Sequence, residues 1–195
     1  MIGDPYESGE DDPACYAGTK VLRNLRDVVD STALEEFEIE AVGQRSLQPP
    51  PEGDFNAAHY RALHKHLFQD VYVWAGEYRT IRTAKGGSWF CYPEHIGGQM
   101  DALFARLGGA PFLPGGDEES FIAGLADFVG DLNAIHPFRE GNGRTQLYFV
   151  RLLGLRAGHP LRSEAVERDA FLRAMIESFH GRMEALIDEL ERMLA

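Results

Sequence analysis

The clearest pattern in this sequence is a run of apolar residues at helical spacing between residues 121 and 135. They recur every three or four positions, which places them on one face of an α-helix. The members of this set are Phe121, Leu125, Phe128, Leu132 and Ile135. A second stretch, residues 145–155, is apolar nearly all round, which indicates a buried helix. Together the two stretches favour a mainly α fold.

Helical signals recur along the rest of the chain. Ser31 or Thr32 is the expected N-cap of a helix over residues 33–44, and the prolines at 49–51 stop it. Further helices are predicted from Asp54, from Pro93, and near residues 169–179 and 183–194.

Residues 78–92 have a different composition. Strand-forming residues lie on both sides of the tetrapeptide Lys85-Gly86-Gly87-Ser88, and a Gly-Gly turn between two short extended runs is typical of a β-hairpin. The sequence has no internal repeat and no linker that would divide it. We therefore expect a single domain over residues 1–195, helical with one hairpin, that begins with a flexible polar segment over residues 1–13.

Charge and side-chain content limit the functions expected of this chain. Its formal net charge is −12, which opposes binding to a phosphate backbone, so direct nucleic-acid binding is not expected. Cys15 and Cys91 do not suggest a disulfide framework, and His59, His64 and His66 lack a zinc-ligand spacing and are interpreted as surface or capping residues. The sequence shows neither a signal peptide nor a membrane span. The expectation is a soluble cytoplasmic protein.

The most informative stretch joins the two helices described first: residues 136–144, with the sequence HPFREGNGR. It reads as a short loop that runs into the start of a buried helix, where free N–H groups and a partial positive charge favour phosphate. Gly141 and Gly143 let main-chain amides approach a ligand closely, and Asn142 can donate its side-chain amide to the same oxygens. The stretch therefore predicts a phosphate-binding site.

Three side chains around this predicted site differ in character. Glu140 offers an oxygen ligand for Mg²⁺, Arg144 offers a cation for charge on a leaving pyrophosphate, and His136 can accept a proton from an attacking hydroxyl. Each residue alone has a structural explanation, as a cap, a turn residue or a surface ion pair. The whole set within one short stretch is typical of phosphoryl-type transfer.

Residues 136–144 closely resemble the signature of the Fic family, His-x-Phe-x-Asp/Glu-Gly-Asn-Gly-Arg-x-x-Arg. Residues 16–24 resemble the family's toxin-type opening, and residues 67–79 and 85–90 resemble the approach to its flap and the flap itself. The resemblance implies a Fic fold, which is a helical core with a short β-hairpin flap over the active site. It also implies an enzyme that uses Mg²⁺ and ATP to transfer AMP to a hydroxyl side chain of a target protein.

The resemblance assigns roles to individual residues. They are a general base at His136, a Mg²⁺ ligand at Glu140, phosphate binding by Gly141, Asn142, Gly143 and Arg144, and docking of the target as an added strand by Thr83, Lys85, Gly86 and Gly87 of the flap. Doc-type kinases carry lysine at the position of Gly143, so this glycine resembles the AMP-transferring branch. The resemblance also implies bacterial cytoplasm, a small antitoxin partner with an inhibitory glutamate helix, and type II topoisomerase subunits as targets.

The chain departs from the signature at Leu147, where the pattern has a second arginine that contacts the γ-phosphate. In one interpretation Leu147 is a core leucine and ATP binding is weakened or altered. In the other, Arg151, which follows Arg144 by seven residues on nearly the same helix face, is a substitute cation. The first is preferred, since the second rests on helix geometry alone. The departure leaves two alternative functions: transfer of another phosphate-linked group, or a catalytically weak binding module.

Overall fold

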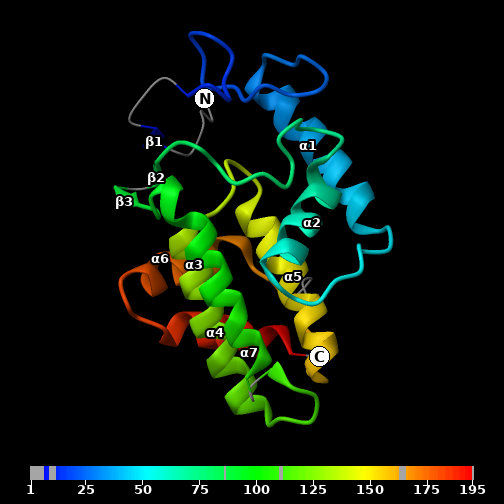
Figure 1. Ribbon diagram of the computed structural model, residues 1–195, viewed down its shortest axis with the longest axis vertical. Helices are drawn as coiled ribbons and strands as arrows, with labels where there is room; N and C mark the ends of the chain where they lie inside the picture. Colours follow the sequence, from blue (N-terminus) through cyan, green and yellow to red (C-terminus); the bar gives the residue numbers. More distant parts are fainter. Residues whose placement is uncertain (1–6, 9–11, 86, 110–111, 163–165, 195) are drawn as a thin grey trace.

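The computed structural model describes residues 7–8, 12–85, 87–109, 112–162 and 166–194. The α-helices in these residues (Figure 1) are α1 (Ser31–Ser46), α2 (Ala57–Phe68), α3 (Pro93–Ala105), α4 (Glu118–Ile135), α5 (Asn142–Ala157), α6 (Arg168–Phe179) and α7 (Glu184–Met193). A 3₁₀ turn, η1 (Arg106–Gly108), directly follows α3. None of these helices is long and apolar enough to cross a membrane. The mainly α fold predicted from the sequence is confirmed.

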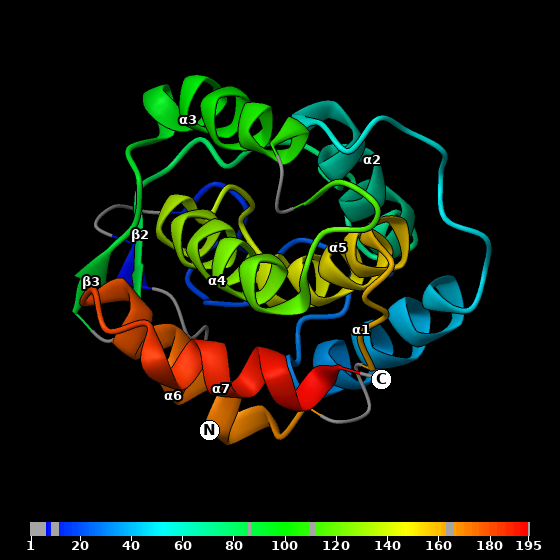
Figure 2. The same cartoon turned by 90° about the horizontal axis from the view of Figure 1, so that it is seen from below.

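Helix α4 is the centre of the helical body. It packs against α3, α5, α6 and α7, and seen from below it lies among the surrounding helices (Figure 2). Its buried residues include all five whose spacing predicted the helix. Further apolar residues of α4 are buried between them, so this helix contacts neighbours on several sides rather than on one face only.

The helices begin at polar residues close to the predicted positions. Asp30 caps α1, where Ser31 or Thr32 was expected, and Asn56 caps α2, where Asp54 was expected. In both cases the side-chain oxygen accepts an N–H group that has no partner within the first turn of the helix. Helix α3 begins with a proline, as predicted.

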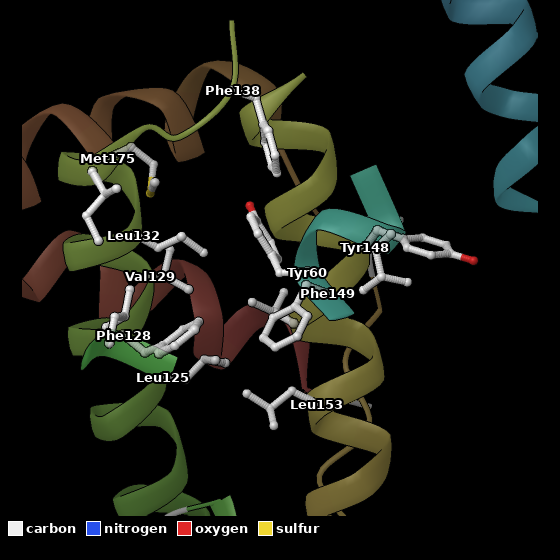
Figure 3. Close-up of a cluster of buried hydrophobic side chains, with 14 of the residues drawn as sticks. Tyr60, Leu125, Phe128, Val129, Leu132, Phe138, Tyr148, Phe149, Leu153 and Met175 are labelled. Carbon is white, nitrogen blue, oxygen red and sulfur yellow. The ribbon is translucent and has the colours of Figure 1, made fainter. Parts of the chain in front are cut away.

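Aromatic rings fill the space between α2, α4 and α5 (Figure 3). The ring centroid of Tyr60 on α2 lies 5.4 Å from that of Phe149 on α5 and 5.5 Å from that of Phe138 in the loop after α4. Phe128 on α4 lies 5.9 Å from Phe149. All four side chains are fully buried, and burying one such ring contributes roughly 1.5–3 kcal/mol. Phe138 therefore anchors the loop that follows α4 in the core.

The predicted hairpin is confirmed but shorter than expected. In the described part of the predicted range 78–92, only β2 (Thr83–Lys85) and β3 (Ser88–Trp89) form paired strands. Gly87 has a φ of +79° in the turn between them, a conformation that glycine adopts without strain. Gly86 lies outside the described residues.

The N-terminal segment contacts both the hairpin and the loop after α4. Strand β1 (Glu7–Ser8) pairs antiparallel with β2, an element that the sequence did not predict. The carboxylate of Asp12 lies 2.5 Å from Nε of Arg139, in an ion pair whose two side chains are 4–5% exposed. Of the segment 1–13 predicted to be flexible, residues 1–6 and 9–11 lie outside the described part of the chain.

Candidate active site

The loop between α4 and α5 begins and ends in left-handed backbone conformations. His136 ends α4 with a φ of 49°, and Gly141 precedes α5 with a φ of 80°. A Cβ at position 141 would lie 2.3 Å from the Phe68 ring, so both conformation and space require glycine there. The left-handed region is uncommon for a residue other than glycine, so the conformation of His136 depends on contacts from its surroundings.

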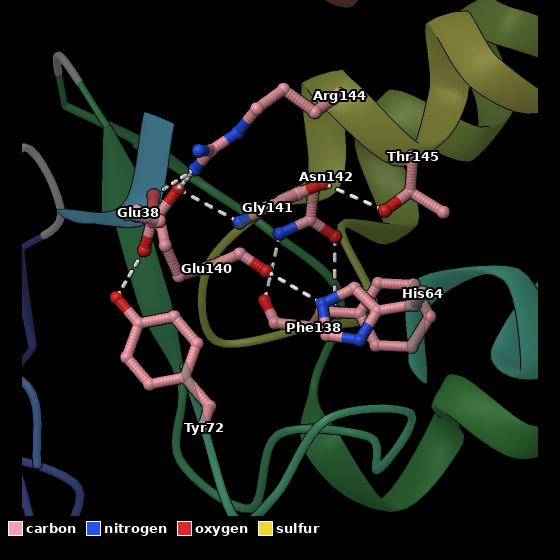
Figure 4. A network of polar contacts seen from close by, with 9 residues as sticks. All are labelled: Glu38, His64, Tyr72, Phe138, Glu140, Gly141, Asn142, Arg144 and Thr145. Atoms are coloured by element: carbon pink, nitrogen blue, oxygen red, sulfur yellow. Dashed lines mark hydrogen bonds and ion pairs between the residues drawn. The ribbon is translucent and has the colours of Figure 1, made fainter. Parts of the chain in front are cut away.

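The side chain of Asn142 holds this loop closed. Its Oδ1 accepts the N–H of Phe138 at 2.9 Å, and its Nδ2 donates to the Phe138 carbonyl at 2.8 Å (Figure 4). Asn142 is 1% exposed. The sequence predicted that this amide binds phosphate, and the structure corrects that prediction, because the amide is used within the loop. The main-chain N–H of Asn142, at the start of α5, takes no part in these two contacts.

His64 is a second internal support of the loop. Its Nε2 donates to the Glu140 carbonyl at 3.0 Å, its Nδ1 accepts the N–H of Gly76 at 2.8 Å, and its ring stacks on Phe138 with centroids 3.8 Å apart. Burial lowers the pKa of His64 to about 3, so the ring is neutral. The interpretation of His64 as a surface or capping residue was wrong, because this face of α2 packs on the loop.

The first turn of α5 faces an open space. The N–H groups of the first residues of a helix have no partner inside the helix, and the helix dipole makes this end favourable for anions. A Cβ at Gly143 would meet nothing within 4 Å. The helix start therefore has the geometry that phosphate binding requires.

Carboxylates already surround Arg144. Its guanidinium forms an ion pair with Glu38 of α1, and a second one at 3.3 Å with Glu140 (Figure 4). The Tyr72 hydroxyl donates to the other carboxylate oxygen of Glu38. Burial and the Glu38 carboxylate raise the pKa of Glu140. Two carboxylates thus share one guanidinium, and an added cation would offset the excess negative charge.

The His136 imidazole lies against the hairpin. Its ring stacks on Phe90 with centroids 3.9 Å apart and an angle of 10° between the planes, and the residue is 6% exposed. Burial, together with the positive charges of Arg79 and Lys85, lowers the pKa of His136 to about 3. A neutral imidazole has one nitrogen that accepts a proton. Negative charge brought close to the ring would raise its pKa towards neutrality.

A cavity of about 810 Å³ lies in front of these residues, a volume within the range of small-molecule sites. Its wall comes from residues 20–22, α1, the hairpin, the start of α5, and α6. The predicted site residues that it brings together are Lys85, His136, Glu140, Gly141, Gly143 and Arg144. The wall also includes Leu147.

Other predicted site residues lie elsewhere. Thr83 and Gly87 belong to the hairpin but not to the cavity wall, and the Thr83 side chain is buried. Arg151 lies about 10 Å further along α5 than Arg144, beside Tyr148 rather than at the cavity. The interpretation of Arg151 as a substitute cation was therefore wrong, because a side chain leaning back by one turn does not span two turns of helix.

Several residues that line the cavity belong to no recognisable sequence motif. Glu38 belongs to an acidic run on α1, and nothing in the sequence distinguishes it from its neighbours. Tyr72 reaches the same carboxylate from the segment after α2. Lys20 and Arg168 bring positive charge to the wall. The apolar wall from α6 consists of Phe171, Leu172, Met175, Ile176 and Phe179.

Comparison with known proteins places these features in a family. The model of the Fic/DOC family matches residues 54–153. The chain is 49% identical over 185 residues to the probable protein adenylyltransferase y4lH of Sinorhizobium fredii, which covers 94% of this chain and 96% of that protein. It is 30% identical over 189 residues to the probable protein adenylyltransferase Fic of Escherichia coli, covering 95% and 92%. Its match to the protein adenylyltransferase VbhT of Bartonella schoenbuchensis, at 35% identity, covers 97% of this chain but 40% of that protein.

Solved structures have the same fold. The BepC protein of Bartonella tribocorum with bound AMPPNP superposes with a TM-score of 0.84 at 27% identity, covering 93% of this chain and 96% of that chain. The N-terminal Fic domain of a cell filamentation protein from Bartonella quintana with bound ADP gives a TM-score of 0.84 at 28% identity, covering 93% and 94%.

Proposed function

Because the chain belongs to the Fic/DOC family, we propose that it is a protein adenylyltransferase, which transfers AMP from ATP to a hydroxyl side chain of another protein. The observation that carries this proposal is that His136 and the start of α5 line one cavity of nucleotide size. Relatives that are named protein adenylyltransferases, and related Fic domains that hold AMPPNP or ADP, support it.

In this proposal the phosphates of ATP lie against the first turn of α5. The main-chain N–H groups of Asn142 and Gly143 point along the helix axis towards them. Arg144 exchanges the Glu38 carboxylate for a phosphate oxygen. Fixed N–H groups and a guanidinium stabilise the charge that develops on the departing pyrophosphate.

His136 acts as the base for the target hydroxyl. The hydroxyl oxygen forms a bond to the α-phosphorus, its proton passes to the imidazole, and the bond between the α-phosphorus and the pyrophosphate oxygen breaks. The ring is neutral before the reaction, since its pKa is lowered to about 3. The negative charge of the nucleotide raises that pKa and makes the ring a stronger base.

Glu140 fits a Mg²⁺ ion. Its side chain is 21% exposed, it borders the cavity, and the N–H of Gly141 holds one of its oxygens at 2.7 Å. In the described part of the chain, no three His, Cys, Asp or Glu side chains form a metal cage. The remaining ligands would then be phosphate oxygens and water, which would suit Mg²⁺. When bound, the ion would neutralise charge on the phosphates.

The hairpin would dock the target protein. An extended target segment adds to a sheet edge through main-chain hydrogen bonds. One edge of β2 pairs with β1, so docking at that edge requires β1 to leave. We also propose, on the family resemblance, an antitoxin with an inhibitory glutamate and a topoisomerase target. Co-purification of either partner with the His136→Ala variant tests these proposals.

A second candidate function rests on Leu147. This side chain and the apolar face of α6 both line the cavity, so the position given to the γ-phosphate by the family pattern has no arginine. A donor with a different group on its β-phosphate fits such a wall. In that case the chain transfers another phosphate-linked group.

Labelled ATP separates these functions. The purified protein is incubated with Mg²⁺, cell lysate and ATP labelled on either the α- or the γ-phosphate. We expect protein-bound label from the α-position only, and none with His136→Ala. The matched control is His95→Ala, because His95 is exposed on α3 and does not line the cavity; it should keep full activity.

Each other outcome has a defined meaning. Label from the γ-position would show a kinase. No label from either position would refute adenylyl transfer, and the same assay with CDP- or UDP-linked donors labelled in either phosphate would then test the second candidate.

A further inference from the structure

Arg79 connects the hairpin to the end of α4. Its side chain is 4% exposed. Its Nε donates to the main-chain carbonyl of His136 at 2.8 Å, and its Nη2 donates to that of Ile135 at 3.1 Å. The last carbonyls of a helix have no partner within the helix, so the guanidinium satisfies two acceptors where α4 stops.

The same guanidinium also binds the chain on both sides of the hairpin, just before β2 and just after β3. Its Nη1 donates to the Ile81 carbonyl at 2.7 Å, and its Nη2 donates to the Cys91 carbonyl at 2.5 Å. The main-chain N–H of Arg79 donates to Pro137 at 2.9 Å. One residue thus links the two ends of the hairpin with the three consecutive residues 135–137.

The acceptors of these side-chain bonds are main-chain oxygens rather than a carboxylate. Burial lowers the pKa of Arg79 to about 10, so the side chain is still charged at neutral pH. A planar guanidinium offers five N–H donors in a fixed arrangement. A lysine keeps the charge but cannot reach all four carbonyls at once.

The backbone at His136 needs this support. Its φ of 49° and ψ of 64° are left-handed, which costs free energy for any residue with a Cβ. That conformation turns the imidazole onto Phe90 and towards the cavity. Arg79 therefore binds the main-chain carbonyl of His136, the same residue whose imidazole faces the cavity.

We infer that Arg79 is a positioning residue for His136, which fixes the orientation of the imidazole and ties it to the hairpin. This inference rests on the proposed role of His136 as the base. Movement of the hairpin when a target docks would pass directly to the imidazole through this side chain.

The charge of Arg79 also acts on the imidazole. Among the residues that the structure describes, the positive charges of Arg79, of Lys85 on β2 and of Arg139 in the loop each lower the pKa of His136. Removing one positive charge while the others remain should raise the pKa of His136 by about one unit.

NMR titration of isotopically labelled histidines tests the inference without any transferase assay. The His136 signal is assigned by its loss in His136→Gln. In Arg79→Met we expect the pKa of His136 to rise by about one unit. We also expect the chemical shifts of its imidazole ring to change. In Arg79→Lys the pKa should change less, but the ring shifts should still move, because the carbonyl contacts are lost. The matched control is Arg82→Met, since Arg82 packs over the rings of Trp89 and Tyr92.

Kinetics give a second readout. Arg79→Lys should lower kcat at least tenfold with little change in KM for ATP, because binding is kept and only the base is misplaced. Unchanged ring shifts and pKa of His136 in a folded Arg79 variant would overturn the inference. Should Arg79→Met not fold, the ring shifts of Arg79→Lys decide in the same way. An inactive wild type with the expected NMR shifts would refute the proposed function and leave the positioning role intact.

Discussion

Gly141→Ala should destabilise the protein through two separable effects. The first is the backbone, because a φ of 80° is left-handed and costs a residue with a Cβ about 1–2 kcal/mol. The second is space, because the new Cβ would lie 2.3 Å from the Phe68 ring, and overpacking a core costs about 1–3 kcal/mol. The expected loss of unfolding free energy is the sum, about 2–5 kcal/mol, a large share of the ~5–15 kcal/mol typical of a domain.

Gly143→Ala is the matched control. It lies two residues later inside α5, its Cβ would meet nothing within 4 Å, and replacing a helical glycine stabilises by up to ~1 kcal/mol. Urea unfolding followed by far-UV circular dichroism measures both variants. Equal unfolding free energies for the two variants would refute the reasoning.

The spatial part can be isolated in a Phe68→Leu background. There the contact is reduced, so Gly141→Ala should cost only the backbone part, about 1–2 kcal/mol. If the cost of Gly141→Ala were as large as in the wild type, the Phe68 ring would not be the cause.

Three further predictions concern the site. Leu147→Arg should tighten ATP binding about tenfold, or ~1.4 kcal/mol, and leave AMP binding unchanged, as measured by calorimetry. Equal effects on ATP and AMP binding would show that Leu147 does not face the γ-phosphate. Glu38→Gln should tighten ATP binding several-fold in the same assay, since phosphate no longer competes with a carboxylate for Arg144, and weaker binding would contradict this. His64 has a folded pKa of about 3 against about 6.5 when unfolded, so its contribution to stability is complete well above pH 6.5 and falls as the pH drops. Lowering the pH from 6.5 to 5 should therefore reduce the unfolding free energy by about 1.6 kcal/mol less in His64→Gln than in the wild type. An equal reduction in the two proteins would show that His64 is protonated in the folded protein.

The helices could be predicted because their apolar spacing records which faces are buried. Errors occurred at their ends, where Asp30 and its neighbours Ser31 and Thr32 are all good caps. Strand β1 was missed, since two residues carry no periodicity. A mainly helical fold with one hairpin could therefore be predicted from the sequence.

The site was predicted only where its residues are adjacent in sequence. Residues 136–144 carry their own pattern, but the partner of Arg144 is Glu38, which lies 106 positions away and is one of several acidic residues on α1. Which of these carboxylates reaches the guanidinium depends on how α1 packs. Asn142 is the opposite case: it belongs to the motif, but its side chain points inward and binds the loop itself.

The cavity has a consequence for how the protein acquires its activity during synthesis. The matched family region ends at residue 153, yet α6 and residues 20–22 supply parts of the wall. A nascent chain that has exposed the residues up to the motif loop has the reactive groups together with residues 20–22, α1 and the hairpin, but it lacks the part of the wall that α6 supplies. The site is complete only after α6 has emerged from the ribosome and packed, so an unfinished chain would leave any bound nucleotide open to water.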